Sequence, residues 1–183
     1  MKNHTPSELV LSALFLAVGL ILPFFTGNIR TIGNLLLPMH LPVLLCGLVC
    51  GKYYGAAIGF LLPPLRSLLF GMPIFYPSAI AMAFELATYG FTVGLLYERF
   101  PQKNLSSVFG SLAVSMLTGR LVWGAAMTVL TGLSGKAFSL ALFWTNGFVK
   151  AIPGVILQFI LIPPLFSVIK TIRKKKRSNE KKA

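Results

Sequence analysis

Long apolar stretches alternate with short polar turns along this chain. A helix that crosses a membrane needs about 20 mostly apolar residues. The stretches that approach this length are Leu9–Phe25, Leu35–Val49, Tyr53–Phe70, Pro77–Tyr97, Leu105–Leu130 and Gly147–Ile169, and an amphipathic connector, Ala137–Trp144, precedes the last. The pattern predicts an all-α membrane protein with six transmembrane helices. We expect one transmembrane domain over residues 1–172 and a basic tail over residues 173–183.

Glycine and proline shape the second and third predicted spans. Glycines recur every fourth residue from Gly47 to Gly59, but the Gly51-Lys52 turn interrupts the series. We therefore expect these glycines to allow a tight hairpin between the two helices. Pro38 and Pro42 flank His40, and each proline removes a backbone hydrogen bond. We expect an irregular start to this helix.

The basic residues predict the orientation of the helices. The chain carries 17 Lys and Arg against four acidic residues. Cytoplasmic loops of membrane proteins are enriched in Lys and Arg, so the side with more of them is predicted to be cytoplasmic. With both termini inside, the inner side holds Lys2, Lys52, Arg99, Lys103 and the tail cations, while the outer loops hold Arg30 and Lys136.

The overall composition favours a membrane protein over a soluble basic one. Hydrophobic residues make up 55% of the chain and charged residues 11%, whereas soluble domains carry about 25% charged residues. The basic tail follows an apolar span, so it indicates an anchor near anionic lipid, and we expect no nucleic-acid partner. The first span lacks a cleavage signature and is predicted to be retained. Cys46 and Cys50 are interpreted as small buried residues, with no metal site expected.

Five ionisable side chains lie in or at the ends of the predicted spans. A charge near the bilayer centre costs roughly 3 kcal/mol, so such residues usually face a cavity or a partner. With the termini inside, all five fall in the outer half of the membrane, which predicts a small-molecule pocket open to the outside. These residues are His40, Arg66, Glu85, Arg120 and Lys150.

Cations outnumber acids among these groups. Pairing Glu85 with Arg66 or with Arg120 would offset part of the burial cost, and a remaining cation would favour an anionic ligand. An aromatic ligand would instead stack on aromatic rings of the spans. The predicted substrate-binding residues are His40, Arg66, Glu85, Tyr89, Arg120, Trp123, Asn146 and Lys150, with no catalytic or metal-binding residue expected.

Several of these residues also have simpler roles open to them. Tyr76 and Trp144 could be interfacial belt residues, and Lys150 could extend its ammonium to the interface. Asn146 and Gln158 could bind ligand or bridge helices. The histidine could bond a broken backbone nearby.

Three segments together resemble the substrate-binding S components of energy-coupling factor (ECF) vitamin transporters. They are LLLPMHLPVLLCGLVCGKYYGAAIGFLLPPLRSLLFGMP, then SAIAMAFELATYGFTVGLLY, and later GRLVWG. Ala13 and Ala17 supply a small-xxx-small pattern in the first span. The resemblance extends over nearly the whole chain, and the segment pattern is most similar to members predicted to carry pantothenate.

The resemblance implies a fold, partners and a mode of action. S components have six helices, cytoplasmic termini and a vitamin-sized pocket near the outer surface of a bacterial cell membrane. The fourth to sixth helices line that pocket, and the loop between the first two closes it. Ala13 and Ala17 would dock on a transmembrane coupling subunit driven by two ATPases, during which the S component is thought to topple. The chain has no GxxxxGK[ST] phosphate loop, so the ATPases would be separate. No cofactor is expected.

The sequence also leaves other substrates and other protein classes open. Within the family, hydroxymethylpyrimidine or pyridoxine-type vitamins are alternatives to pantothenate. An intramembrane enzyme would need more than one embedded acid and one embedded histidine. A secondary transporter would be expected to show an internal repeat. A scaffold protein would bind no ligand.

Overall fold

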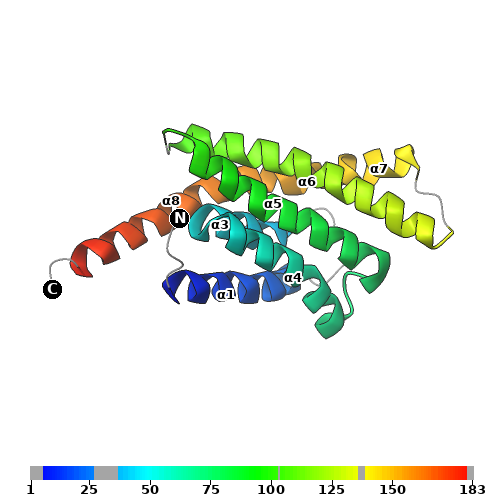
Figure 1. Ribbon diagram of the computed structural model, residues 1–183, viewed down its shortest axis with the longest axis horizontal. Helices are drawn as coiled ribbons and strands as arrows, with labels where there is room; N and C mark the ends of the chain where they lie inside the picture. Colours follow the sequence, from blue (N-terminus) through cyan, green and yellow to red (C-terminus); the bar gives the residue numbers. More distant parts are fainter. Residues whose placement is uncertain (1–5, 27–36, 103, 136–138, 181–183) are drawn as a thin grey trace.

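The fold consists of helices joined by short connections. A computed structural model describes residues 6–26, 37–102, 104–135 and 139–180, with side chains up to residue 175. These residues contain no strand, and the long helices run roughly along one axis (Figure 1). The elements in chain order are α1 (Pro6–Ile21), η1 (Leu22–Thr26), α3 (His40–Cys50), α4 (Lys52–Phe70), η2 (Phe75–Ala79), α5 (Ile80–Arg99), α6 (Leu105–Leu133), α7 (Leu140–Gly147), η3 (Val149–Ala151) and α8 (Ile152–Glu180).

Each predicted span contains a helix, but the helices differ in length from the predicted spans. Among the described residues, four helical stretches are long and apolar enough to cross a membrane: Pro6–Phe25, Phe75–Arg99, Leu105–Leu133 and Leu140–Lys175. Helix α3 has only 11 residues, about 16 Å of rise against a hydrocarbon core of about 30 Å. The helical part of the predicted second span therefore begins at His40 and is too short to cross alone. The count of six spans stays a prediction.

The start of α3 is irregular, as the flanking prolines predicted. Leu37 adopts a positive φ of 49°, and its carbonyl accepts the first turn's hydrogen bond from the His40 N–H at 3.1 Å. The predicted start of the span at Leu35 lies outside the described residues. At the other end of α3, Gly51 has a φ of 101°, which a glycine adopts without steric cost. This residue makes the tight turn into α4.

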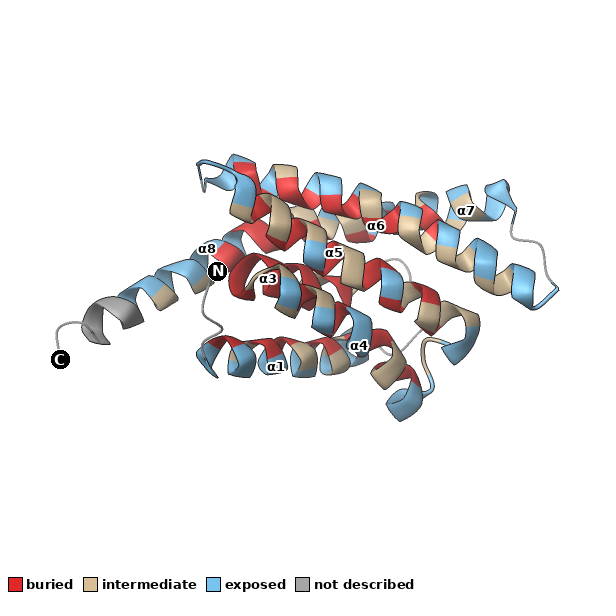
Figure 2. Cartoon of the chain, viewed as in Figure 1, coloured by how far each residue is buried: buried red, intermediate tan, exposed pale blue. Residues whose placement is uncertain are grey.

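Glycines bring the backbones of α3, α4 and α5 into contact. A methyl group added to Gly55 would lie 2.7 Å from the Cα of Gly47, and one added to Gly90 would lie 2.8 Å from the Cα of Gly55. The predicted tight hairpin is thus confirmed, and its glycines also receive α5. This crossing lies in the buried centre of the bundle, where α3 is buried almost throughout (Figure 2).

Helix α6 packs on α5 through small residues spaced four apart. Ser107, Ser111 and Ser115 are buried, and the Ser111 and Ser115 hydroxyls donate to carbonyls of their own helix at 2.7 and 2.9 Å. Gly119 continues the series. Small residues at this spacing let two helices approach closely, so α6 lies tightly against α5 as far as the site described below.

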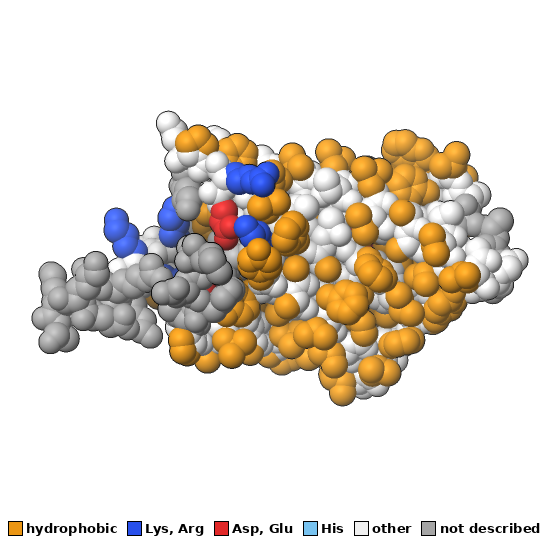
Figure 3. All heavy atoms as spheres, viewed as in Figure 1, with side chains coloured by type: hydrophobic (Ala, Val, Ile, Leu, Met, Phe, Trp, Pro, Cys, Tyr) orange, Lys and Arg blue, Asp and Glu red, His pale blue; other side chains and the backbone are white. Residues whose placement is uncertain are grey.

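Both described ends of the chain lie at one end of the bundle, together with the α5–α6 turn (Figure 1). Lys and Arg side chains gather there on the visible face, and apolar side chains cover most of the rest (Figure 3). Arg173 of α8 donates to the Val49 carbonyl at 2.7 Å and lies 3.7 Å from the Glu8 carboxylate. Lys52 pairs with Glu98 at 3.2 Å. These contacts fasten α8 and α4 to the other helices at the basic end.

Helix α8 continues without a break into the predicted tail. It reaches Glu180, and its last turns extend past the other helices (Figure 1). The basic segment therefore extends the last helix as far as the structure describes it.

Candidate functional site

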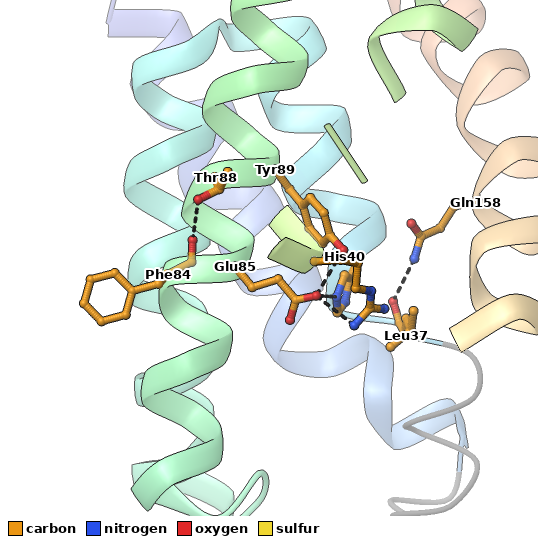
Figure 4. A network of polar contacts seen from close by, with 8 residues as sticks. Leu37, His40, Phe84, Glu85, Thr88, Tyr89 and Gln158 are labelled. Atoms are coloured by element: carbon orange, nitrogen blue, oxygen red, sulfur yellow. Dashed lines mark hydrogen bonds and ion pairs between the residues drawn. The ribbon is translucent and has the colours of Figure 1, made fainter. Parts of the chain in front are cut away.

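Four polar side chains from three helices meet in the interior. Glu85 of α5 is 1% exposed, and its Oε1 lies 2.8 Å from Nη1 of Arg120. The same oxygen accepts a hydrogen bond from the Tyr89 hydroxyl at 3.0 Å. Nε2 of His40 lies 3.7 Å from it, and Figure 4 shows the side chains of His40, Glu85 and Tyr89 pointing toward one another. We call these four residues the Glu85 cluster.

Local helix geometry positions each member of the cluster. Glu85 and Tyr89 are one turn apart on α5, so their side chains share a face. The Tyr89 ring lies against Gly119 of α6, where an added methyl group would come within 3.0 Å of its Cζ. The next residue, Arg120, thereby reaches the carboxylate. The His40 ring lies 5.3 Å from the Tyr89 ring, centroid to centroid.

The cluster contains buried polar atoms that have no partner among the described residues. They are both ring nitrogens of His40, and Nε and Nη2 of Arg120. A buried donor without a partner costs about 1–3 kcal/mol, and such groups in a native protein require an explanation. Nε and Nη2 lie on one edge of the guanidinium, the fork that binds a carboxylate through two parallel hydrogen bonds. A carboxylate is therefore the kind of group whose two oxygens match these two donors.

The backbone before His40 is fixed by the last helix. Gln158 of α8 is buried and donates from Nε2 to the Leu37 carbonyl at 3.5 Å (Figure 4). Gln158 thus links α8 to the residues just before α3, and a role in ligand binding stays a prediction. The sequence carried no indication of this particular partner, because the two residues are 121 positions apart.

Arg66 makes its described contacts away from the cluster. Its Nη1 donates to the Leu20 carbonyl near the end of α1 at 2.5 Å. Its guanidinium lies 5.0 Å from the Phe24 ring centroid and 5.4 Å from that of Phe70. Of the two cations considered for Glu85, Arg120 is the one that pairs with it. A substrate-binding role for Arg66 stays a prediction.

The remaining predicted site residues lie beyond the cluster, near α7. Trp123 is one turn after Arg120 on α6 and stacks on Phe143 of α7, with ring planes 22° apart. Lys150 is exposed and donates to Oδ1 of Asn146 at 3.0 Å. The structure thus brings together four of the eight predicted residues in the cluster. Binding roles for Trp123, Asn146 and Lys150 stay predictions.

The aromatic residues considered for stacking or for an interfacial belt differ in their contacts. The Tyr76 hydroxyl donates to the Leu130 carbonyl at the end of α6, so this side chain fastens the α4–α5 connection to α6. Trp144 is 59% exposed and contacts the Phe148 ring at 4.9 Å. No group of three or more His, Cys, Asp or Glu that could hold a metal ion occurs within the described part of the chain.

A model of the family described as ECF transporter, substrate-specific component, matches residues 7–166. The chain belongs to this family. As an ECF substrate-specific component it is a multi-pass membrane protein and a substrate-binding transport subunit that works with an ECF module. No curated protein sequence and no solved structure matches the chain significantly.

The substrate-specific component exposes one face of α1. Ala13 and Ala17 are both exposed, together with larger neighbours such as Leu14 at 58%. The opposite face, including Phe15 and Gly19, is buried against the bundle. The small-residue pattern is therefore accessible on the outside of the helix bundle.

Proposed function

We propose that this substrate-specific component captures a small carboxylate vitamin outside a bacterial plasma membrane, with pantothenate as the best candidate. The observation that carries the proposal is the edge of the Arg120 guanidinium formed by Nε and Nη2. Its Nη1 already bonds to Glu85, whereas Nε and Nη2 are buried without a partner in the described residues. A ligand carboxylate would satisfy both donors at once.

The family and the exposed face of α1 support a proposal for the partners. A transmembrane coupling subunit would pack against Ala13 and Ala17, where small side chains let another helix approach closely. Two separate ATPase subunits would supply the energy for release into the cytoplasm. The gathering of cations at the end of the bundle that holds both described termini (Figure 3) supports cytoplasmic termini.

The position of Trp123 bears on the alternative ligands. Its ring already stacks on Phe143, and the Tyr89 hydroxyl already bonds to Glu85. An aromatic vitamin such as hydroxymethylpyrimidine or a pyridoxine-type compound would compete with these contacts. An anionic ligand needs no such exchange, which favours pantothenate.

A binding experiment on the purified protein in detergent tests the proposal. Pantothenate, its alcohol analogue with –CH₂OH in place of the carboxylate, hydroxymethylpyrimidine and pyridoxine are compared by thermal shift and calorimetry. Saturation at 100 times Kd raises native-state stability by about 2.7 kcal/mol. We expect a clear shift with pantothenate and a much smaller one with the alcohol.

The variant Arg120→Gln should weaken pantothenate binding roughly 10- to 150-fold, because a charge-assisted contact contributes about 1.5–3 kcal/mol. Arg99→Gln makes the same substitution at an exposed position near the end of α5 and should leave Kd unchanged. Equal binding of pantothenate and its alcohol analogue, or unchanged binding by a folded Arg120→Gln protein, would contradict the anionic ligand.

A further inference from the structure

The Glu85 cluster is balanced in charge before any ligand binds. One carboxylate, Glu85, faces one guanidinium, Arg120, at 2.8 Å. His40 Nε2 lies 3.7 Å from the same carboxylate oxygen, and neither ring nitrogen has a hydrogen-bond partner among the described residues. A neutral imidazole leaves the pair balanced, whereas an imidazolium would add an uncompensated positive charge. Buried charges are tolerated when they are paired.

Binding of a carboxylate would upset this balance. The ligand anion on the Arg120 fork, as proposed above, would give the cluster two negative charges and one positive charge. An uncompensated charge in such a site costs several kcal/mol, and buried groups usually avoid that cost by changing protonation state. His40 is placed to do so, because imidazole takes up a proton far more readily near neutral pH than a carboxylate does.

The charged and titratable groups around His40 show which acid a protonated His40 would pair with. From α5 it meets Glu85 at 3.7 Å and the Tyr89 ring at 5.3 Å, and α6 supplies Arg120 to the same carboxylate. The charged groups of α4 and α8 that have described contacts make them with residues other than His40. On α4, Arg66 contacts α1 and Lys52 pairs with Glu98. On α8, Arg173 lies near Glu8 and Lys170 donates to Tyr97. On α1, Glu8 faces Arg173. Glu85 is thus the acid that an imidazolium at His40 would bind.

We infer that this protein captures its anionic substrate together with a proton, taken from water onto His40. The bound site then holds two carboxylates, the guanidinium and an imidazolium whose Nε2–H donates to Glu85. The inference rests on the proposed function and adds a rule for affinity. In the pH range where His40 is neutral in the free protein and protonated in the complex, Kd rises by up to about tenfold for each unit of increasing pH.

Calorimetry of the full chain in detergent tests this with pantothenate as the probe. Titrations at one pH in buffers of low and high ionisation enthalpy give the number of protons taken up per ligand, and a series from about pH 6 to pH 8 gives the slope of Kd. The ligand carboxylate stays ionised throughout this range. We expect an uptake approaching one proton and tighter binding at lower pH.

Three variants assign the proton. His40→Gln should bind without proton uptake and with a flat pH profile. Glu85→Gln should also lose the uptake, because a single ligand anion then balances the single guanidinium. Arg99→Gln, the exposed control used above, removes a charge outside the cluster and should retain the uptake, which shows that the loss is specific to His40 and Glu85.

The outcomes separate the two proposals. Pantothenate binding by the native protein with no proton uptake would overturn the inference and leave the proposed function standing. Uptake that persists in His40→Gln or in Glu85→Gln would also overturn it, because the proton would then go elsewhere. If pantothenate does not bind the native protein at all, the proposed function itself fails.

Discussion

At the scale of single residues, a glycine decides which side chains can meet at the site. Gly119 leaves room for the Tyr89 ring, and this close approach brings Arg120 onto Glu85. The charge pattern of the sequence leaves two candidate partners for Glu85, both of them arginines in apolar stretches. Which arginine pairs with it depends on how α5 packs on α6, and the positions of charges along the sequence do not predict that packing.

The variant Gly119→Ala tests this dependence. The added methyl group would come within 3.0 Å of Cζ of Tyr89, and the ring would have to move away from α6. We expect a loss of about 1–3 kcal/mol in unfolding free energy, as is usual for overpacking, and weaker substrate binding. Thermal unfolding in detergent and calorimetry measure both.

Gly132→Ala is the matched control on the same helix, because nothing lies within 4 Å of its added methyl group. That variant should be neutral or slightly more stable, since alanine favours the helix by about 0.5–1 kcal/mol. Similar stability and binding in the two variants would show that Tyr89 is not held by α6.

At the scale of helices, the apolar pattern predicted where most elements lie, because burial in lipid requires continuous hydrophobic stretches. It did not predict where α3 begins. That boundary depends on the positive φ of Leu37 and on its hydrogen bond to Gln158, which comes from the other end of the chain. The pattern also did not show which helix the hairpin glycines face.

The three-helix crossing can be tested at Gly90. A methyl group there would lie 2.8 Å from the Cα of Gly55, and backbone cannot swing aside as a side chain can. Gly90→Ala should therefore lower the unfolding free energy by about 3 kcal/mol, at the upper end of overpacking effects. Gly110→Ala, whose nearest contact would be Phe100 at 3.5 Å, should be tolerated. A Gly90→Ala protein that unfolds with the native midpoint would refute the tight crossing.

At the scale of the whole molecule, the proposed substrate site and the proposed docking face lie in different parts of the bundle. The Glu85 cluster is interior, whereas Ala13 and Ala17 are exposed on α1. The two functions should therefore be separable by mutation.

The double variant Ala13→Leu and Ala17→Leu is expected to bind pantothenate with native Kd but to lose association with the coupling subunit, because leucine side chains would hold the two helices apart. Co-purification with the coupling subunit and ATPases measures the loss. Ala57→Leu, which enlarges an exposed alanine on α4, is the control and should assemble normally. Assembly of the double variant at the native level would place the docking face elsewhere.

The unbroken course of α8 has a consequence for observing transport. Its 29 residues rise about 43 Å, and Arg173 and Glu8 hold the helix to α1 at the basic end. The final turns continue this helix beyond these contacts as far as Glu180. A tilt of the bundle by about 20° would displace one end of this helix relative to the other by about 15 Å. A fluorophore on the last turn should report the orientation of the helices in the membrane during each cycle.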